Sequence, residues 1–341
     1  MTVTVRSFAK INLGLYIGPP RADGFHDLRT VYQTIALQDV IRVAVSRGSA
    51  IEIRCEDPRV PRGSSNTCYG IAERVMAALG ASRRVTIEIE KRLPVQGGLG
   101  AASSNAVATM LALEHALRKR LTGSERLRIA AEVGSDLPLF AIGGTVLGVG
   151  RGEEVYPLPD LPGIPLVVIT PEVGVSTPQA FADWDELTRR ETQGRSTPLR
   201  MATTDRAGLT HPGGSDRLNE VGRVLSAWLS STPVAGAPAG GKRGGRAGNL
   251  SDLVRAGIRN DFERVVFSQI PELLDMKRAL ERAGSRYASL SGSGSALYGL
   301  FGSPSEAAKA AKHLQKQGLR VVATRTLTRR EYWKKLLAGS H

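Results

Sequence analysis

The chain has 341 residues, of which 41% are hydrophobic and 23% are charged, a composition typical of a globular protein long enough for two domains. The lack of a long apolar run, of a secretory signal pattern and of a CxxC cysteine pair argues against a membrane protein, a secreted disulfide-rich protein and a zinc protein, and favours the cytoplasm. The formal charge of +14 raises nucleic acid as a partner, so a basic binding protein has to be weighed against an enzyme.

The first 90 residues are predicted to form mainly strands, because apolar residues alternate or run continuously over short stretches. We expect strands at residues 2–18, 31–37, 40–45, 51–55 and 85–89, a turn at 21–27, and a helix at 67–80 that ends at Gly80. Lys10 lies in the first apolar run, where a lysine is ordinarily an outward-facing, solvated residue. Phe25 and His26 lie at the predicted turn, where an exposed ring is either incidental or stacks on a nucleobase whose edge a histidine can hydrogen-bond.

The most informative stretch, LPVQGGLGAASSN at 93–105, places a glycine cluster between a predicted strand and a predicted helix. Glycine has no Cβ, so its backbone N–H groups can approach a phosphate closely, and the N-terminus of a helix adds unpaired N–H groups and a positive dipole end. The hydroxyl groups of Ser103 and Ser104 are further donors, and one of them could bind Mg²⁺. GxxxxGK[ST] and GxGxxG are both absent. We favour a phosphate loop over the alternative, a plain turn with a serine N-cap.

Asp136 follows a second predicted helix near 124–133 and has apolar neighbours. Such an aspartate needs a cationic partner or a chemical role, although a turn in which it bonds its own backbone is the ordinary interpretation. A Lys10–Asp136 pair across a cleft would be different. Lysine could steady developing phosphate charge, and aspartate could take the proton of a substrate hydroxyl group.

The rest of the chain alternates between helices and strands around one low-complexity segment. Strands are expected at 144–149, 165–170, 287–290, 296–301 and 320–327, and helices at 261–283 and 305–317. Residues 231–248 are rich in Gly, Ala and Pro and predict a flexible surface insertion whose deletion leaves activity nearly intact. The glycine-rich SGSGS at 291–295 is interpreted as a turn. Phe181 is either a buried core residue or a second stacking ring.

The positive charge is concentrated in two segments. Residues 308–341 hold nine Lys or Arg and one acid, and residues 186–250 hold ten Lys or Arg and five acids. We interpret them as a solvated C-terminal face and a basic insertion, with a surface that attracts polyanions as the alternative.

The motifs together resemble the superfamily of galactokinase, homoserine kinase, mevalonate kinase and phosphomevalonate kinase. The segments that carry the resemblance are AKINL at 9–13, RADGFH at 21–26, the glycine-rich stretch 93–105, GSDLP at 134–138, NDFE at 260–263 and LSGSG at 290–294. Each is moderately specific alone, but in this order and spacing they are specific. Within the superfamily the chain is most similar to the kinases that act on a cytidine-diphosphate-linked sugar alcohol.

The resemblance implies an α/β (α+β) fold with a ribosomal-protein-like, ATP-binding N-terminal domain at 1–160 and a ferredoxin-like C-terminal domain at 161–341. The active site would lie in the cleft between them, and a flexible basic insertion would occupy about 186–250. The implied reaction uses ATP and Mg²⁺ to phosphorylate the 2-hydroxyl group of the sugar alcohol in the non-mevalonate route to isoprenoid precursors. A monomer or weak homodimer is expected.

The resemblance also implies a role for each matching residue. Asp136 would be the general base and Lys10 its charged partner. The ATP-binding residues would be Pro94, Val95, Gln96, Gly97, Gly98, Leu99, Gly100, Ala101, Ala102, Ser103 and Ser104, with Asn66 nearer the adenine and Ser104 as the candidate Mg²⁺ ligand. The substrate-binding residues would be Asn12, Phe25, His26, Thr177 and Phe181.

Several departures from the family's pattern, among them Ser135 in place of an alanine and Asn105 in place of an acid, and two rivals qualify this interpretation. Ala101 and Ala102 stand where the family usually has two glycines, and because alanine tolerates positive φ poorly we expect the loop to sit differently. Phe25 replaces a tyrosine, which keeps a stacking face and loses a hydroxyl group. One rival is another kinase of the superfamily that acts on homoserine or a mevalonate-like acid; a small acid, however, needs no stacking platform. The other is a nucleic-acid-binding protein with the same N-terminal fold, which should carry cations along a surface with aromatic residues between them.

Overall fold

The computed structural model describes residues 2–95, 97–193, 219, 222–223, 225–226, 254 and 257–337. Gln96 and the low-complexity segment 231–248 lie outside these residues, so the predictions made for them are not addressed by the structure. Among the residues described, no helix is both long and apolar enough to cross a membrane.

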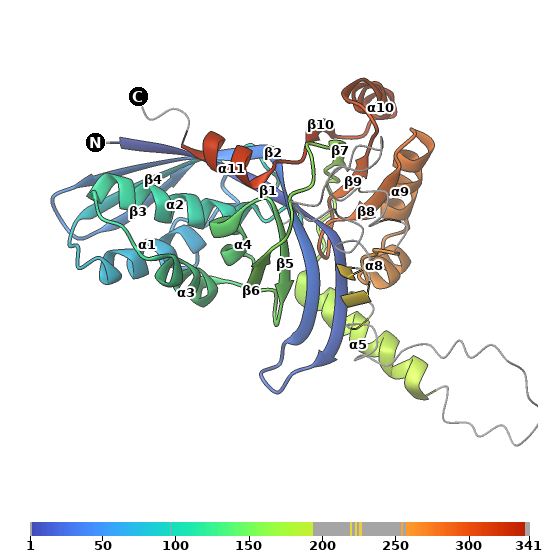
Figure 1. Cartoon of the computed structure of the whole chain (residues 1–341), viewed down its shortest axis with the longest axis horizontal. Coiled ribbons are helices and arrows are strands. Elements are labelled where there is room, and N and C mark those ends of the chain that lie inside the picture. Colours follow the sequence, from blue (N-terminus) through green and yellow to red (C-terminus); the bar gives the residue numbers. More distant parts are fainter. Residues whose placement is uncertain are drawn as a thin grey trace, which may run out of the picture.

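The described residues form two sheets, each covered by helices (Figure 1). The first sheet has the order β3-β4-β2-β5-β6, with β1 paired to β2, and the second has the order β10-β7-β9-β8. The first contains β1 (Thr2–Pro20), β2 (His26–Ser46), β3 (Ile51–Cys55), β4 (Arg84–Glu90), β5 (Thr145–Val149) and β6 (Glu154–Pro157). The second contains β7 (Pro165–Ile169), β8 (Tyr287–Leu290), β9 (Leu297–Leu300) and β10 (Val321–Arg325).

The helices divide between the two sheets. Those that follow the first strands are α1 (Thr67–Ala78), α2 (Ala101–Leu117), α3 (Gly123–Val133) and α4 (Leu137–Ile142). The later ones are α5 (Thr177–Gln193), α8 (Glu263–Gln269), α9 (Pro271–Arg282), α10 (Pro304–Lys316) and α11 (Arg329–Leu336). This mixed arrangement agrees with the predicted fold class.

Strand β7 shows how the cores are separated. Leu166 and Val168 face the core between the second sheet and the β1–β2 hairpin, whereas Val167 and Ile169 face the core under the helices α5 and α8 to α10. This alternation follows from the two-residue period of a strand. A third core fills the space between the first sheet, helices α1 to α4 and α11.

The β1–β2 hairpin is longer than the sequence predicted. The break expected at 38–39 falls inside β2, a single strand of 21 residues that pairs with the 19 residues of β1 through local irregularities between Phe8 and Lys10 and between Asn12 and Gly14. The predicted end at Leu37 was wrong because Asp39 is completely buried and hydrogen-bonded, so the strand continues through it. The far end of the hairpin lies beside α5 (Figure 1).

Helix predictions were correct in place and wrong in some details. The helix expected after the glycine cluster is α2, and its residues are buried from Ser104 through Glu114, so it packs on all sides. The helix expected at 261–283 is two helices, because Pro271 lacks the N–H group that would continue the hydrogen-bond ladder. The segments that form β6, α5 and α11 were not recognised as regular structure.

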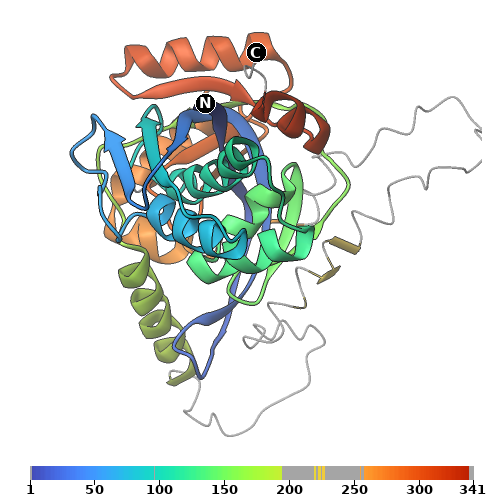
Figure 2. The same cartoon turned by 90° about the vertical axis from the view of Figure 1, so that its left-hand side faces the viewer.

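The last helix, α11, docks on the first core through its apolar residues, while its basic residues Arg330 and Lys334 are exposed, in agreement with a solvated basic face. Tyr332 and Leu336 of α11 are buried in the first core, and α11 lies near the start of β1 (Figure 2). The hydroxyl of Tyr332 donates to the carbonyl of Phe140 (2.7 Å) and the indole N–H of Trp333 donates to that of Ile142 (2.9 Å). Helix α11 therefore caps the end of α4.

We expect Tyr332→Ala to lower the free energy of unfolding by about 3–5 kcal/mol, because it opens a cavity in the first core and leaves the Phe140 carbonyl unpaired. Chemical denaturation measures this loss. Lys334→Ala, an exposed change on the same helix, is the control and should shift the stability by less than about 0.5 kcal/mol. Equal effects of the two changes would contradict the docking of α11.

Candidate active site

Lys10 and Asp136, far apart in the sequence, meet in the structure. The ammonium Nζ of Lys10 lies 3.3 Å from Oδ2 of Asp136 and donates to Oδ1 of Asn12 at 2.6 Å. The Lys10 side chain is only 4% exposed, while that of Asp136 is 34% exposed. Lys10 is thus a buried cation and not the solvated residue of the ordinary interpretation. Asp136 ends on an open side where a ligand can reach it.

Tyr32 holds the other carboxylate oxygen of Asp136. Its hydroxyl donates to Oδ1 of Asp136 at 3.0 Å, and the Lys10 ammonium lies 5.6 Å from its ring centre. Burial, with the neighbouring charge of Asp136, holds the pKa of the Tyr32 hydroxyl well above its usual value. Tyr32 therefore remains a neutral donor, and Asp136 is fixed from two directions.

The glycine loop wraps the start of α2 next to this pair. Gly98 and Gly100 adopt positive φ of 71° and 68°, which disfavours any residue with a side chain. A Cβ on Gly98 would lie 2.1 Å from the Ser291 carbonyl oxygen, and one on Gly100 would lie 3.0 Å from Cγ of Lys10. These two glycines let the loop approach both the second glycine segment and Lys10.

Ala101 and Ala102 do not adopt the positive φ on which our expectation for the loop depended. Both lie in the first turn of α2 with helical backbone, and the positive φ angles fall on the glycines before them. Alanine is a strong helix former, so the two residues suit their positions.

The SGSGS segment is more than a turn between strands. The Ser291 hydroxyl donates to the Gly98 carbonyl (3.0 Å), and the Ala296 N–H donates to the Gly97 carbonyl (3.2 Å). The segment therefore supports the glycine loop from the side of the second sheet.

A cavity of about 340 Å³ opens at the N-terminus of α2. Its lining includes the predicted ATP-binding residues Asn66, Pro94, Val95, Gly97, Gly98, Leu99, Gly100, Ala101, Ala102 and Ser103. Asn66 also caps α1, because its Oδ1 accepts the Cys68 N–H and its Nδ2 donates to the Pro61 carbonyl. The loop thus borders a cavity, as a phosphate-binding loop must.

The aromatic residues gather at the far end of the hairpin. The His26 ring stacks on Phe181 with centroids 4.9 Å apart and planes 11° apart, and its Nε2 lies 2.7 Å from Oδ1 of Asp185. Phe25 is 51% exposed at the tip, with the Arg151 guanidinium 4.9 Å from its ring centre. Two aromatic candidates therefore touch, and the third lies next to His26 in the chain.

Thr177 contacts the segment that supports the glycine loop, and Asn12 lies beside Lys10. The Thr177 hydroxyl is 2.7 Å from that of Ser293, in the segment next to the glycine loop, and Phe181 lies one helical turn further along α5. Asn12 is buried, and its amide donates to Thr30 while its oxygen accepts from Lys10. In this structure Asn12 orients Lys10.

The Lys10–Asp136 pair is well separated from the aromatic residues Phe25, His26 and Phe181. Tyr32, which binds Asp136, and His26 are six residues apart on β2, which corresponds to about 20 Å along a strand. An extended ligand could contact both ends, whereas a small amino acid or hydroxy acid could not.

Two family models match parts of this chain. Residues 66–144 match the family model of the GHMP kinases N-terminal domain, and residues 242–319 match that of the GHMP kinases C-terminal domain. A 4-diphosphocytidyl-2-C-methyl-D-erythritol kinase of Solibacter usitatus is 36% identical over 87% of this chain and 80% of its own length. A kinase of the same name from Moorella thermoacetica is 32% identical over 95% of this chain and 99% of its own length.

The chain belongs to the 4-diphosphocytidyl-2-C-methyl-D-erythritol kinase family. This confirms the predicted resemblance and makes the protein an ATP-dependent small-molecule kinase, in place of the nucleic-acid-binding alternative. A crystal structure of 4-(cytidine 5'-diphospho)-2C-methyl-D-erythritol kinase superposes with a TM-score of 0.67 at 26% identity, covering 95% of this chain and 99% of that one. The crystal structure of homoserine kinase from Cytophaga hutchinsonii superposes with a TM-score of 0.68 at 21% identity, and the match covers 96% of this chain and 95% of that one. The fold is therefore common to kinases with different names, and sequence identity distinguishes among them.

Sequence reasoning missed several residues of the kinase that contact the predicted site. Tyr32, Thr30 and Ser293 are polar residues in strands or turns, where nothing in their spacing marks them. Asp185 escaped notice because the helix that presents it to His26 was not predicted. Only the register of β1 against β2 and the packing of α5 on the hairpin reveal them.

The residues present suit a metal ion that arrives with the nucleotide. Within the part of the chain described, no three His, Cys, Asp or Glu side chains are grouped as a metal site. Mg²⁺ in kinases takes most of its ligands from phosphates and water, so few protein ligands are needed. The Ser104 hydroxyl is buried and accepts from Ser7 (2.7 Å), whereas Ser103 lines the cavity. The assignment of Ser104 as a ligand of Mg²⁺ remains a prediction.

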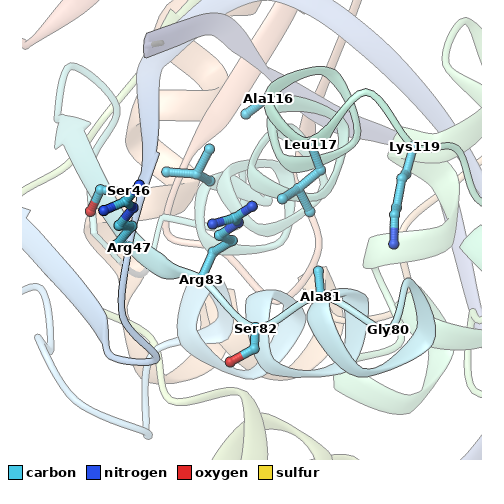
Figure 3. A pocket seen from close by; sticks show the side chains of 10 residues that line it. Ser46, Arg47, Gly80, Ala81, Ser82, Arg83, Ala116, Leu117 and Lys119 are labelled. Atoms are coloured by element: carbon cyan, nitrogen blue, oxygen red, sulfur yellow. The ribbon is translucent and has the colours of Figure 1, made fainter.

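A second, larger cavity of about 510 Å³ lies at the opposite end of α2 (Figure 3). It is lined by Arg47, Arg83 and Lys119, among others, and by none of the predicted site residues. At about 1.5 Å per residue, the 17 residues of α2 place it roughly 25 Å from the glycine loop. Size alone therefore does not identify the active site of this kinase.

Proposed function

We propose that the protein transfers the γ-phosphate of ATP to the 2-hydroxyl group of 4-diphosphocytidyl-2-C-methyl-D-erythritol, a step of the non-mevalonate route to isoprenoid precursors. The observation that carries the assignment of the reaction is the contact of Lys10 with Asp136 beside the glycine loop. The names of the family's relatives support the acceptor.

Asp136 acts as the general base in this mechanism. Its exposed carboxylate takes the proton of the acceptor hydroxyl as the new bond to the γ-phosphorus forms and the bond to the β–γ bridging oxygen breaks, which releases ADP. Lys10 lies on the buried side and offsets the negative charge that develops between the carboxylate and the phosphoryl group. Tyr32 keeps Asp136 oriented through its hydrogen bond.

The glycine loop and the start of α2 hold the triphosphate. Their N–H groups and the positive end of the helix dipole favour negative charge. The residues assigned to ATP are Pro94, Val95, Gln96, Gly97, Gly98, Leu99, Gly100, Ala101, Ala102, Ser103 and Ser104, with Asn66 nearer the adenine. Bound Mg²⁺ would supply neutralisation of the phosphate oxygens, and Ser103 or Ser104 would be its protein ligand.

The aromatic cluster binds the cytidine end of the acceptor. Phe25 and Phe181 offer ring faces for the base, and His26, fixed by Asp185, offers its ring to the base edge. Thr177 and Asn12 lie along the path between the base and Asp136. The separation of about 20 Å along β2 favours an extended acceptor over homoserine or mevalonate.

A panel of acceptors tests this proposal. The protein is incubated with ATP, Mg²⁺ and one of 4-diphosphocytidyl-2-C-methyl-D-erythritol, homoserine or mevalonate, and ADP release and phosphorylated product are measured. We expect turnover with the cytidyl compound alone. Faster turnover with either small acid would overturn the acceptor assignment while leaving the kinase chemistry in place.

Phe25→Ala is expected to weaken binding of the cytidyl acceptor by about 1–3 kcal/mol, since the lost contact is base stacking. The KM for ATP should change little, because the ring lies far from the glycine loop. Tyr156→Ala, which removes a ring of similar exposure on β6, is the control. An equal loss of affinity for ATP and acceptor would speak against the stacking role.

A further inference from the structure

Asp39 of β2 is a charged residue with no exposed surface. Its Oδ1 accepts the backbone N–H groups of Arg92 (2.7 Å) and Leu93 (2.8 Å). Its Oδ2 accepts from Nζ of Lys91 (2.6 Å) and from Nδ2 of Asn105 (3.0 Å). One carboxylate therefore satisfies four donors, and the Lys91 charge balances its own.

These donors come from the two ends of the glycine loop. Arg92 and Leu93 lead into it, whereas Asn105 lies in α2, directly after the loop's two serines. The two oxygens of Asp39 thus hold the entrance and the exit of the loop to one point on β2. Lys91 and Asn105 also line the cavity at the start of α2.

Strand β1, which pairs with β2 at Asp39, also contacts the first turn of α2. Ser7 of β1 pairs with Asp39 across the sheet, and its hydroxyl donates to that of Ser104 at 2.7 Å. The backbone N–H of Lys10 donates to the Leu99 carbonyl at 3.0 Å. Hydrogen bonds therefore fix the position of the glycine loop relative to the β1–β2 hairpin, which also carries Lys10.

Asn105 has a buried side-chain oxygen without a hydrogen-bond partner among the described residues. An unpaired buried acceptor such as this Oδ1 opposes folding. Its Nδ2 donates one hydrogen bond, to Oδ2 of Asp39. Asn105 is therefore a costly residue in this core, and its side-chain contact joins α2 to Asp39.

We propose that Asp39 is a positioning residue for ATP: by binding both ends of the glycine loop, directly and through Asn105, it fixes the backbone N–H groups that hold the phosphates. The inference rests on the proposed role of the loop. Donors arranged before the ligand arrives bind charge without a cost of reorganisation, so a loop released at one end should bind phosphates more weakly.

Asp39→Asn is the sharpest test, because a carboxamide has the same shape but a single acceptor oxygen. Whichever way it turns, its NH₂ group faces donors, either at the loop entrance or at Lys91 and Asn105. We expect the affinity for MgATP, measured by calorimetry without an acceptor, to fall about tenfold or more. The KM for ATP should rise in parallel, while the KM for the acceptor stays within about twofold.

Glu114→Gln is the matched control. Glu114 is a buried carboxylate on the same helix, and it accepts the Leu121 N–H (2.6 Å) and contacts Arg126 (3.0 Å) at the end remote from the cavity. It should lower the melting temperature without changing the affinity for ATP. Unchanged affinity in Asp39→Asn, or equal weakening in both variants, would overturn the proposal.

Asn105→Leu is the second variant, and it serves if Asp39→Asn fails to fold. It removes the exit contact together with the unpaired oxygen, so the melting temperature should stay near that of the parent while the affinity for MgATP falls severalfold. Unaltered affinity for MgATP would refute the proposal that Asp39 positions the glycine loop through Asn105. Because no acceptor is present in either titration, the result decides the role of Asp39 whichever alcohol the acceptor panel identifies.

Discussion

Asp136→Asn is expected to slow phosphoryl transfer by about 10²–10⁴-fold while leaving the affinity for ATP near that of the parent. The carboxamide keeps the shape of the side chain and can still accept from Tyr32, but it cannot take the proton of the acceptor hydroxyl. Single-turnover kinetics with saturating ATP measure the chemical step, and calorimetry measures ATP binding separately. A loss confined to the chemical step is what a general base predicts.

The control for this change is Asp160→Asn. Asp160 is a partly buried carboxylate that accepts the N–H groups of Thr145 and Arg329, outside the predicted site. It should affect stability and leave the chemical step nearly unchanged. If Asp136→Asn instead turned over at a near-normal rate, Asp136 would have to be removed from the base role, and Lys10 would be left as a purely structural cation.

Local patterns predicted the parts of the site that depend on neighbours in the chain. The glycine cluster before α2 could be recognised because positive φ and close phosphate approach require glycine at particular positions, and the structure places positive φ at Gly98 and Gly100. Helix α1, which ends just before Gly80, followed from the same kind of signal. In contrast, Lys10 and Asp136 each had an ordinary interpretation that was more probable when the residue was taken alone.

Their contact depends on long-range packing that no local pattern encodes. Lys10 points toward Asp136 because of the register and irregularities of the β1–β2 hairpin, and Asp136 is held in place by a short helix that α11 caps from the other end of the chain. The basic residues of α11 concealed its two buried positions, Tyr332 and Leu336. The resemblance of the whole set of motifs, in order, supplied the juxtaposition that residue-by-residue reasoning could not.

Lys10→Met is expected to lower the rate of transfer by about 10²–10³-fold, because it removes one preorganised cation from the place where charge develops. Methionine is similar in length and apolar, so it can occupy the buried site between Asn12 and Tyr32 without adding volume. The loss should appear in kcat, with a smaller change in the KM for the acceptor, since Lys10 contacts Asp136 and lies far from the aromatic cluster.

Lys277→Met separates this effect from the general cost of removing a partly buried lysine. Lys277 lies 2.6 Å from the carboxylate of Glu263 between α8 and α9, and its side chain is 20% exposed. It should reduce stability while leaving kcat close to that of the parent. If the two variants lost activity equally, or if Lys10→Met kept its full kcat, the pair of Lys10 and Asp136 would hold the hairpin to α4 without taking part in phosphoryl transfer.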